Sequence, residues 1–143
     1  MKIIFAIPRL TYSGAPKMMA WVANRMAKRG HEVKFVTYFS GERGRELEDN
    51  IDFRYINVVQ SKSRFIRNTV GMLKTLSALD KYVKSEKPDV FVSFLDSVGY
   101  MYLPLARKRC KTVVSERVDP YVYKGIISKI RFYLMSILLV CTI

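Results

Sequence analysis

The stretch that decides the fold is residues 1–37, MKIIFAIPRLTYSGAPKMMAWVANRMAKRGHEVKFVT. A short apolar run, Ile3 to Ile7, is followed by a loop that carries Gly14, and a helix-periodic segment then leads to Gly30. A second apolar run starts at Val33. This order predicts a strand, a glycine loop, a helix and a parallel return strand, which together make one βαβ unit. A glycine between the first strand and its helix lets a phosphate approach the backbone at the positive end of the helix.

The rest of the chain continues the alternation of strands and helices. Val90 to Leu95 is apolar apart from Ser93, which is typical of a strand in a parallel sheet with both faces covered. We expect further strands at 33–38, 53–58 and 112–115, and helices at 17–29, 65–84, 98–108 and 124–138. This alternation indicates an α/β fold: a Rossmann-like, doubly wound, mostly parallel sheet with helices on both faces. A chain of 143 residues has room for one such domain.

The chain is strongly basic. Its 25 Lys and Arg residues against 12 Asp and Glu residues give a formal net charge of +13. Such a charge favours polyanions, which include nucleic acid, anionic lipid headgroups and a diphosphate substrate. A generally solvated basic surface explains the same composition. Because the basic residues are dispersed and no nucleic-acid-binding module is recognisable, we expect no nucleic acid partner.

Cysteine use and hydropathy bear on the compartment. Cys110 and Cys141 share no metal-ligand spacing, so we expect no metal and a reduced, cytoplasmic setting. No run reaches the ~20 apolar residues that a spanning helix needs. The apolar stretch at the N-terminus is too short for the core of a signal peptide. A chain that binds lipid would then do so at the inner face of the plasma membrane.

Three loops are candidates for a site, because ligands of doubly wound sheets lie beyond the carboxyl ends of the strands. They are residues 8–16, 95–99 and 116–120. The first loop lacks GxGxxG, and no acidic residue follows the second strand, so the chain does not have the fingerprint of a dinucleotide-binding protein. Gly14 taken alone fits a structural turn as well as a phosphate approach.

Charged residues also follow the strand expected at 112–115. Arg117 could clamp a phosphate or bond to sugar hydroxyls, and Glu116 could accept from hydroxyls or hold Arg117 in place. An internal ion pair, with Asp119 capping the next turn, explains the same pattern equally well. After the preceding strand, Asp96 fits either a hydroxyl-binding residue or a helix N-cap.

Taken in order, these segments resemble a known family. Residues 13–37, SGAPKMMAWVANRMAKRGHEVKFVT, resemble the GGAE…LA..L..RGHEV..VT signature that opens the retaining nucleotide-sugar glycosyltransferases of family 4, which have the GT-B fold. KPDVFVSFLD (87–96) and VVSERVDP (113–120) resemble later strands of the same N-terminal domain. The S-E-R-x-D-P ending is typical of bacterial enzymes that assemble surface polysaccharides and other glycans.

The resemblance implies roles for residues at matching positions. The family's first loop lies against the donor diphosphate and sugar, and the matching residues are Ser13, Gly14 and Ala15. Pro16 stands where the family usually has glutamate. No cofactor is implied, since the nucleotide-sugar is the substrate.

The reacting centre and the acceptor are implied in the same way. Arg117 falls where many relatives carry a histidine that touches the donor sugar, so Arg117 and its neighbour Glu116 are the catalytic candidates. Acceptor recognition belongs to the N-terminal half of the family's fold. The acceptor-binding candidates are Arg64, Arg67, Asp96 and Asp119. The assignment requires Gly14 and Arg117 to converge at one rim of the molecule.

The implied function is that of the acceptor-side domain of a glycosyltransferase, acting on a glycan or lipid-linked acceptor in polysaccharide or cell-envelope biosynthesis. The family's second domain carries the nucleotide pocket, an Arg/Lys pair and an E-x7-E motif. None of these lies within residues 1–143, so we expect a single N-terminal domain, truncated near its C-terminal end and inactive alone. It would be a natural truncation, a fragment or half of a split enzyme. The alternative function is a basic peripheral membrane-binding module without catalytic activity.

Overall fold

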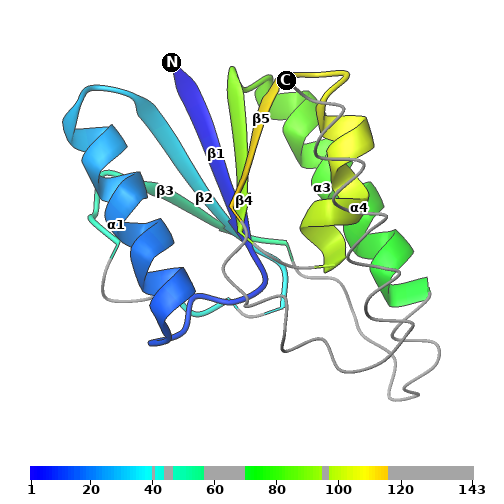
Figure 1. The fold of residues 1–143 in the computed structure, drawn as a ribbon, viewed down its shortest axis with the longest axis horizontal. Coiled ribbons are helices and arrows are strands. Elements are labelled where there is room, and N and C mark those ends of the chain that lie inside the picture. The colour runs from blue at the N-terminus through cyan, green and yellow to red at the C-terminus, as the bar shows by residue number, and fades with distance from the viewer. Residues whose placement is uncertain (40, 44–46, 57–69, 95–96, 116–143) are drawn as a thin grey trace.

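The computed structural model of the chain shows a five-stranded parallel sheet between layers of helices (Figure 1). It describes residues 1–39, 41–43, 47–56, 70–94 and 97–115. The sheet order is β3-β2-β1-β4-β5. In chain order the elements are β1 (Lys2–Ile7), α1 (Gly14–Lys28), β2 (Glu32–Thr37), β3 (Asp52–Tyr55), α3 (Met72–Glu86), β4 (Val90–Phe94), α4 (Ser97–Ala106) and β5 (Lys111–Ser115). The expected α/β, doubly wound, Rossmann-like fold is confirmed.

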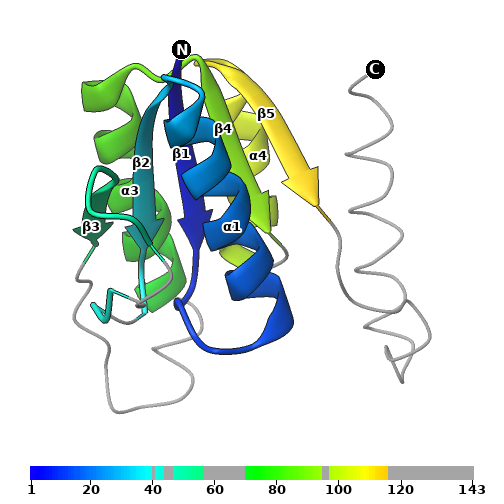
Figure 2. The ribbon, with the colours of Figure 1, turned by 90° about the vertical axis from the view of Figure 1, so that its left-hand side faces the viewer.

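The sheet has a separate apolar core on each face. Figures 1 and 2 show α1 on one face of the sheet and α3 and α4 on the other. Side chains of the central strand β1 alternate between the two cores: Ile3, Phe5 and Ile7 pack on the α1 side, and Ile4 and Ala6 on the α3/α4 side. This explains why β1 reads as a continuous apolar run.

Helix α1 begins earlier than the sequence indicates. Periodicity predicts a start at Lys17, but Ser13 is the last extended residue, and the helix begins at Gly14. Pro16 is therefore in the first turn of the helix, where its missing N–H costs nothing. At the other end, Gly30 adopts a left-handed φ of 81°, as expected for a helix stop.

The remaining boundaries match the expectations within the described residues. Helix α3 ends at Glu86, two residues beyond the expected end, and Lys87, with a φ of 48°, precedes Pro88. Helix α4 forms despite Pro104, which lies inside it. The first part of the helix expected at 65–84, the end of the strand expected at 53–58, and the whole helix expected at 124–138 lie outside the described residues.

Ion pairs gather where the strands begin, which we call the amino edge of the sheet. The Lys34 ammonium, with only 14% of its side chain exposed, lies 2.8 Å from an Asp52 oxygen and 3.1 Å from a Glu86 oxygen. Its hydrogen bond to Asp52 raises the pKa of Lys34 well above its usual range. Lys2 joins the cluster through Glu32, at 3.3 Å. The cluster ties the end of α3 to three strands.

A second ion pair joins α3 to the turn after α4. The Arg109 guanidinium donates to both carboxylate oxygens of Asp80, at 2.7 and 3.1 Å. The buried Tyr102 hydroxyl donates to Asp80 at 3.3 Å. Partial burial opposes ionisation of Asp80, but the hydrogen bonds from Lys84 and Arg109 outweigh it and lower the pKa of this carboxyl.

Candidate functional site

The segments that leave the carboxyl ends of β1, β2 and β3 are bonded to one another. The Pro8 carbonyl, just after β1, accepts a hydrogen bond from the Phe39 amide at 2.8 Å. The carbonyl of Thr37, which ends β2, accepts one from the Ile56 amide at 2.8 Å. Parallel pairing brings these strand ends to one edge of the sheet, the carboxyl edge (Figure 2). This edge is where a doubly wound sheet binds its ligand.

The loop after β1 is an exposed polar turn on a buried anchor. Leu10 is buried in the core on the α1 side. The next residues, Thr11, Tyr12 and Ser13, are exposed. The hydroxyls of Thr11 and Ser13 are 3.0 Å apart and hydrogen-bonded to each other. The loop is therefore held at its base and presents hydroxyl groups at its tip.

Within the described part of the chain, no side chain caps the N-terminus of α1. Ser13 occupies the N-cap position, but its hydroxyl makes no capping hydrogen bond. Its carbonyl accepts from the Lys17 amide at 3.2 Å. The first turn holds no acidic residue, so the amides of Gly14 and Ala15 carry the positive end of the helix dipole without a neutralising side chain. Such an end favours an anion.

The backbone of α1 does not require Gly14 to be a glycine. Its φ is not left-handed, and a Cβ added there would have nothing within 4 Å. A glycine needed for a turn or for close packing would show one of those two features. Gly14 is therefore not explained by the needs of a structural turn. Open space lies beside it at the start of the helix.

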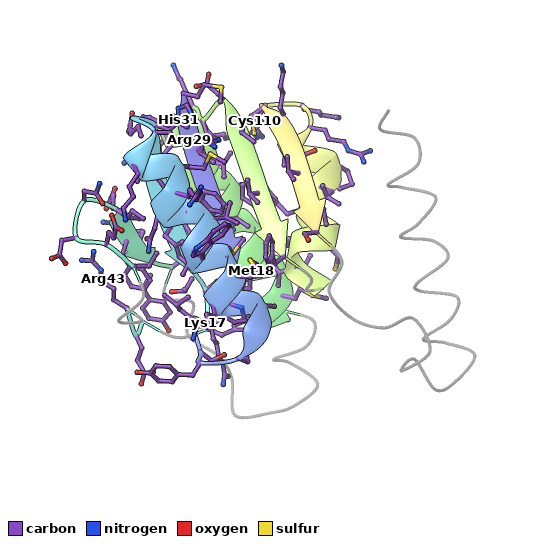
Figure 3. All side chains as sticks on the ribbon, turned by 60° about the vertical axis from the view of Figure 1, so that its left-hand side comes forward. Lys17, Met18, Arg29, His31, Arg43 and Cys110 are labelled. Carbon is purple, nitrogen blue, oxygen red and sulfur yellow. The ribbon has the colours of Figure 1, made fainter. Side chains whose placement is uncertain are left out.

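A hollow of about 370 Å³ extends from this point along α1. Its described lining residues are Gly14, Lys17, Met18, Trp21 and Asn24, all on the helix. Figure 3 shows Lys17 and Met18 near the N-terminal end of α1. The hollow thus joins the uncapped helix end to an outward-facing tryptophan.

The structure brings together one group of the predicted site residues. Ser13, Gly14 and Ala15, the donor-binding candidates, lie in sequence at the start of α1. The catalytic and acceptor-binding candidates lie outside the described residues: Arg64, Arg67, Asp96, Glu116, Arg117 and Asp119. The convergence of Gly14 with Arg117 therefore remains a prediction.

Sequence reasoning missed the outward face of α1. Trp21 is 57% exposed, and the Arg25 guanidinium lies over its ring, 5.2 Å from the ring centre. The sequence did contain a signal for this exposed face: helical periodicity places Trp21 opposite the apolar stripe that includes Met19 and Ala23. Periodicity analysis looks for the buried stripe and passes over a single large residue outside it.

The described residues hold neither a metal-binding group nor a membrane-spanning helix. No three His, Cys, Asp or Glu side chains in the described ranges gather into a metal-binding group. None of the helices described is long and apolar enough to cross a bilayer. The expectation that no metal takes part remains a prediction.

Comparison with known proteins places the chain in a family. A family profile described as Glycosyltransferase Family 4 matches residues 12–139. The chain belongs to glycosyltransferase family 4. The predicted family is thus confirmed over most of the chain, including the loop and helix described above.

One curated relative of the chain comes from Campylobacter jejuni. Its name is GalNAc-alpha-(1->4)-GalNAc-alpha-(1->3)-diNAcBac-PP-undecaprenol alpha-1,4-N-acetyl-D-galactosaminyltransferase. It is 32% identical over 99 residues, which are 69% of this chain and 27% of the relative. The chain therefore spans about a quarter of that relative's length.

Solved structures support the fold. MurG of Acinetobacter baumannii matches with a TM-score of 0.62 at 20% identity, over 81% of this chain and 35% of that protein. A glycosyltransferase from Rickettsia africae matches with a TM-score of 0.54 at 15% identity, over 88% of this chain and 34% of that protein. At these identities the likeness concerns the fold alone. It agrees with the expected N-terminal Rossmann-like domain of the GT-B type in family 4.

Proposed function

We propose that the chain is the acceptor-side domain of a retaining glycosyltransferase. It works with a nucleotide-sugar donor and a glycan or lipid-linked acceptor, in the cytoplasm, during the assembly of polysaccharide or cell-envelope glycans. The observation that carries this proposal is the start of α1: uncapped amides at Gly14 and Ala15, next to open space, in a chain that matches family 4 over residues 12–139.

The chemistry of the proposed donor fits this helix end. Every nucleoside-diphosphate sugar carries two adjacent phosphates with negative charge, and a helix N-terminus offers amide donors and a favourable dipole. The absence of an acidic side chain in the first turn leaves those amides to the ligand. Hydrogen bonds to a charged group contribute about 1.5–3 kcal/mol each. The start of α1 would therefore hold the diphosphate against the loop after β1.

We further propose that residues 1–143 form one domain and that a second domain completes the enzyme. The chain covers 27% of the Campylobacter relative and 35% of MurG, which supports a partner of at least similar size. Leaving-group charge that develops on a diphosphate needs positive groups positioned against it. In this proposal the second domain supplies them, while Glu116 and Arg117 contact the donor sugar from the acceptor side.

The lipid-linked acceptor is the finer part of the proposal. The relative's printed name contains PP-undecaprenol, which supports a polyprenyl-linked acceptor for this chain as well. The acceptor candidates Arg64, Arg67, Asp96 and Asp119 would bind the acceptor's anionic and hydroxyl groups. An enzyme acting on such an acceptor would work at the inner face of the membrane, against an anionic surface.

The decisive experiment is an NMR titration of the isotope-labelled chain with inorganic pyrophosphate, the group that all nucleoside-diphosphate sugars share. We expect the amide resonances of Gly14 and Ala15 to move first and to saturate, whereas sodium chloride at equal ionic strength leaves them in place. Shifts confined to distant lysines such as Lys74 on α3 would contradict the donor assignment.

The two-domain proposal has its own assay. Purified residues 1–143 should show no transfer or hydrolysis of nucleotide-sugar, and activity should appear only when the chain is joined to a second domain. Robust donor turnover by residues 1–143 alone would contradict it.

A further inference from the structure

Helix α1 has two faces of different character. Its inner face is buried against the sheet through Met19, Ala20 and Ala23. Its outer face consists of Lys17, Met18, Trp21 and Arg25, which recur at three- and four-residue spacing. Trp21 stands at the centre of this outer face. A tryptophan at the centre of the solvent side of a helix is the feature that needs an explanation.

Apolar groups are concentrated on the outer face. Trp21 is 57% exposed and Met18 is 41% exposed, and both line the hollow of about 370 Å³. Tyr12, in the turn just before the helix, is 79% exposed. Single exposed apolar residues are ordinary, but adjacent ones around a hollow mark an interaction surface. Its occupant must tolerate both an indole ring and cations.

The charge of α1 is all of one sign. Residues 14–28 contain Lys17, Arg25 and Lys28 and no acidic residue. Arg25 lies over the Trp21 ring, so a cation and an aromatic surface are presented together. Lys28, at the far end of the helix, is 2.7 Å from a Glu48 oxygen. The whole chain carries a net charge of +13.

We propose that the outer face of α1 is the surface that meets an anionic lipid bilayer. Tryptophan and tyrosine favour the level of the headgroups, where an apolar ring is covered and its polar edge stays wet. Lysine and arginine beside them pair with anionic phosphates. The inference rests on the proposed function, because a lipid-linked acceptor brings the enzyme to a bilayer. The side chains of α1 then identify which face of the domain contacts that bilayer.

The chain carries its own probe for the test. Trp21 is its single tryptophan, so the intrinsic tryptophan emission reports on this face alone. On addition of phosphatidylglycerol vesicles we expect a blue shift of that emission, and quenching by lipids brominated near the headgroup end of the acyl chain. Phosphatidylcholine vesicles should give neither effect. Vesicle binding without a change in Trp21 emission would show that another face binds, and would overturn the inference.

Charge variants provide a second measurement. Lys17→Gln with Arg25→Gln should weaken co-sedimentation with phosphatidylglycerol vesicles by roughly 10- to 30-fold, since each cation near an anionic surface contributes about one kcal/mol. The control is Lys74→Gln with Lys81→Gln, which removes the same charge from exposed positions on α3, across the sheet. The control should lose far less. Equal losses would mean that only net charge matters and would overturn the inference.

Further results would distinguish the role of the Trp21 ring, the binding of nucleic acid and the proposed function from one another. Retained vesicle affinity in Trp21→Ala would refute the role of the ring, and its exposure means that the variant should fold. Binding of an oligonucleotide but not of vesicles would replace the bilayer with nucleic acid. No sugar donor is present in these assays, so failure here leaves the pyrophosphate titration as the separate test of the proposed function.

Discussion

Replacing Gly14 with alanine should leave the fold intact while weakening the binding of a diphosphate. Gly14 has a φ outside the left-handed region, and among the described residues nothing beyond its own helix and chain neighbours lies within 4 Å of an added Cβ, so alanine meets no strain there. Alanine also lowers the entropy of the unfolded chain. We expect a gain of about 0.5 kcal/mol in the free energy of unfolding, which is roughly 2 °C in melting temperature.

The new methyl group would occupy the space through which we propose that the diphosphate approaches the helix amides. Loss of one charge-assisted hydrogen bond weakens affinity by roughly 10- to 100-fold. Calorimetry with pyrophosphate and thermal unfolding followed by circular dichroism measure the two effects separately. Stability and affinity should therefore move in opposite directions in this variant.

Gly30→Ala is the matched control. It makes the same chemical change at a left-handed φ of 81°, far from the proposed ligand, and should lower stability by about 1–2 kcal/mol without affecting pyrophosphate binding. The reasoning is refuted if Gly14→Ala loses stability as Gly30→Ala does, because the glycine would then serve the chain itself. It is equally refuted if Gly14→Ala binds pyrophosphate as tightly as the unaltered chain.

Three further predictions concern stability. The pKa of Asp80 is lowered in the folded state. Its contribution to the free energy of unfolding is therefore present above the pKa of the carboxyl in the unfolded chain, and is lost as the pH falls through the pKa in the folded state. Asp80→Asn should lower the free energy of unfolding by about 1–2 kcal/mol at pH 7 and make acid unfolding, followed by circular dichroism, less steep in pH. Lys34→Met should lower the free energy of unfolding, measured by denaturant titration, by about 1–2 kcal/mol, because Glu86 and Asp52 lose a shared partner. An unchanged free energy of unfolding would show that the cluster does not stabilise the fold. Burial raises the pKa of Tyr82 to about 12, so stability should fall between pH 10 and 12, and Tyr82→Phe should reduce that fall. A Tyr82→Phe variant with the same alkaline profile would refute that last prediction.

The order of the elements was predictable because each signal is local. The apolar run at 3–7 and the run at 90–95 have the length and continuity of buried parallel strands, and Gly30 and Lys87-Pro88 mark helix ends. The start of α1 was misplaced by three residues, because Ser13 and Gly14 have only a weak preference for the helical conformation and Pro16 is accepted anywhere in a first turn. The boundaries of a helix or strand depend on such weak preferences, whereas its existence depends on all the apolar residues along its buried face.

The candidate site was predictable only in part. Gly14 was singled out from its place between a strand and a helix, but its openness and the missing cap depend on atoms that no sequence pattern specifies. Trp21 and Arg25 were passed over because their pairing is a tertiary feature of an exposed face. Arg117 and Glu116 were singled out from their place after a strand and given a catalytic role by family resemblance, and both lie outside the described residues.

The ion pairs around Lys34 lie at the amino edge, whereas the loop after β1 and the start of α1 lie at the carboxyl edge. Groups that hold the domain together are thus kept apart from groups proposed to select the ligand. Substitutions in the turn at 11–15 would then alter what the protein recognises at little cost in folding. A lineage could adjust how tightly the diphosphate is held through those few positions while the scaffold stays unchanged.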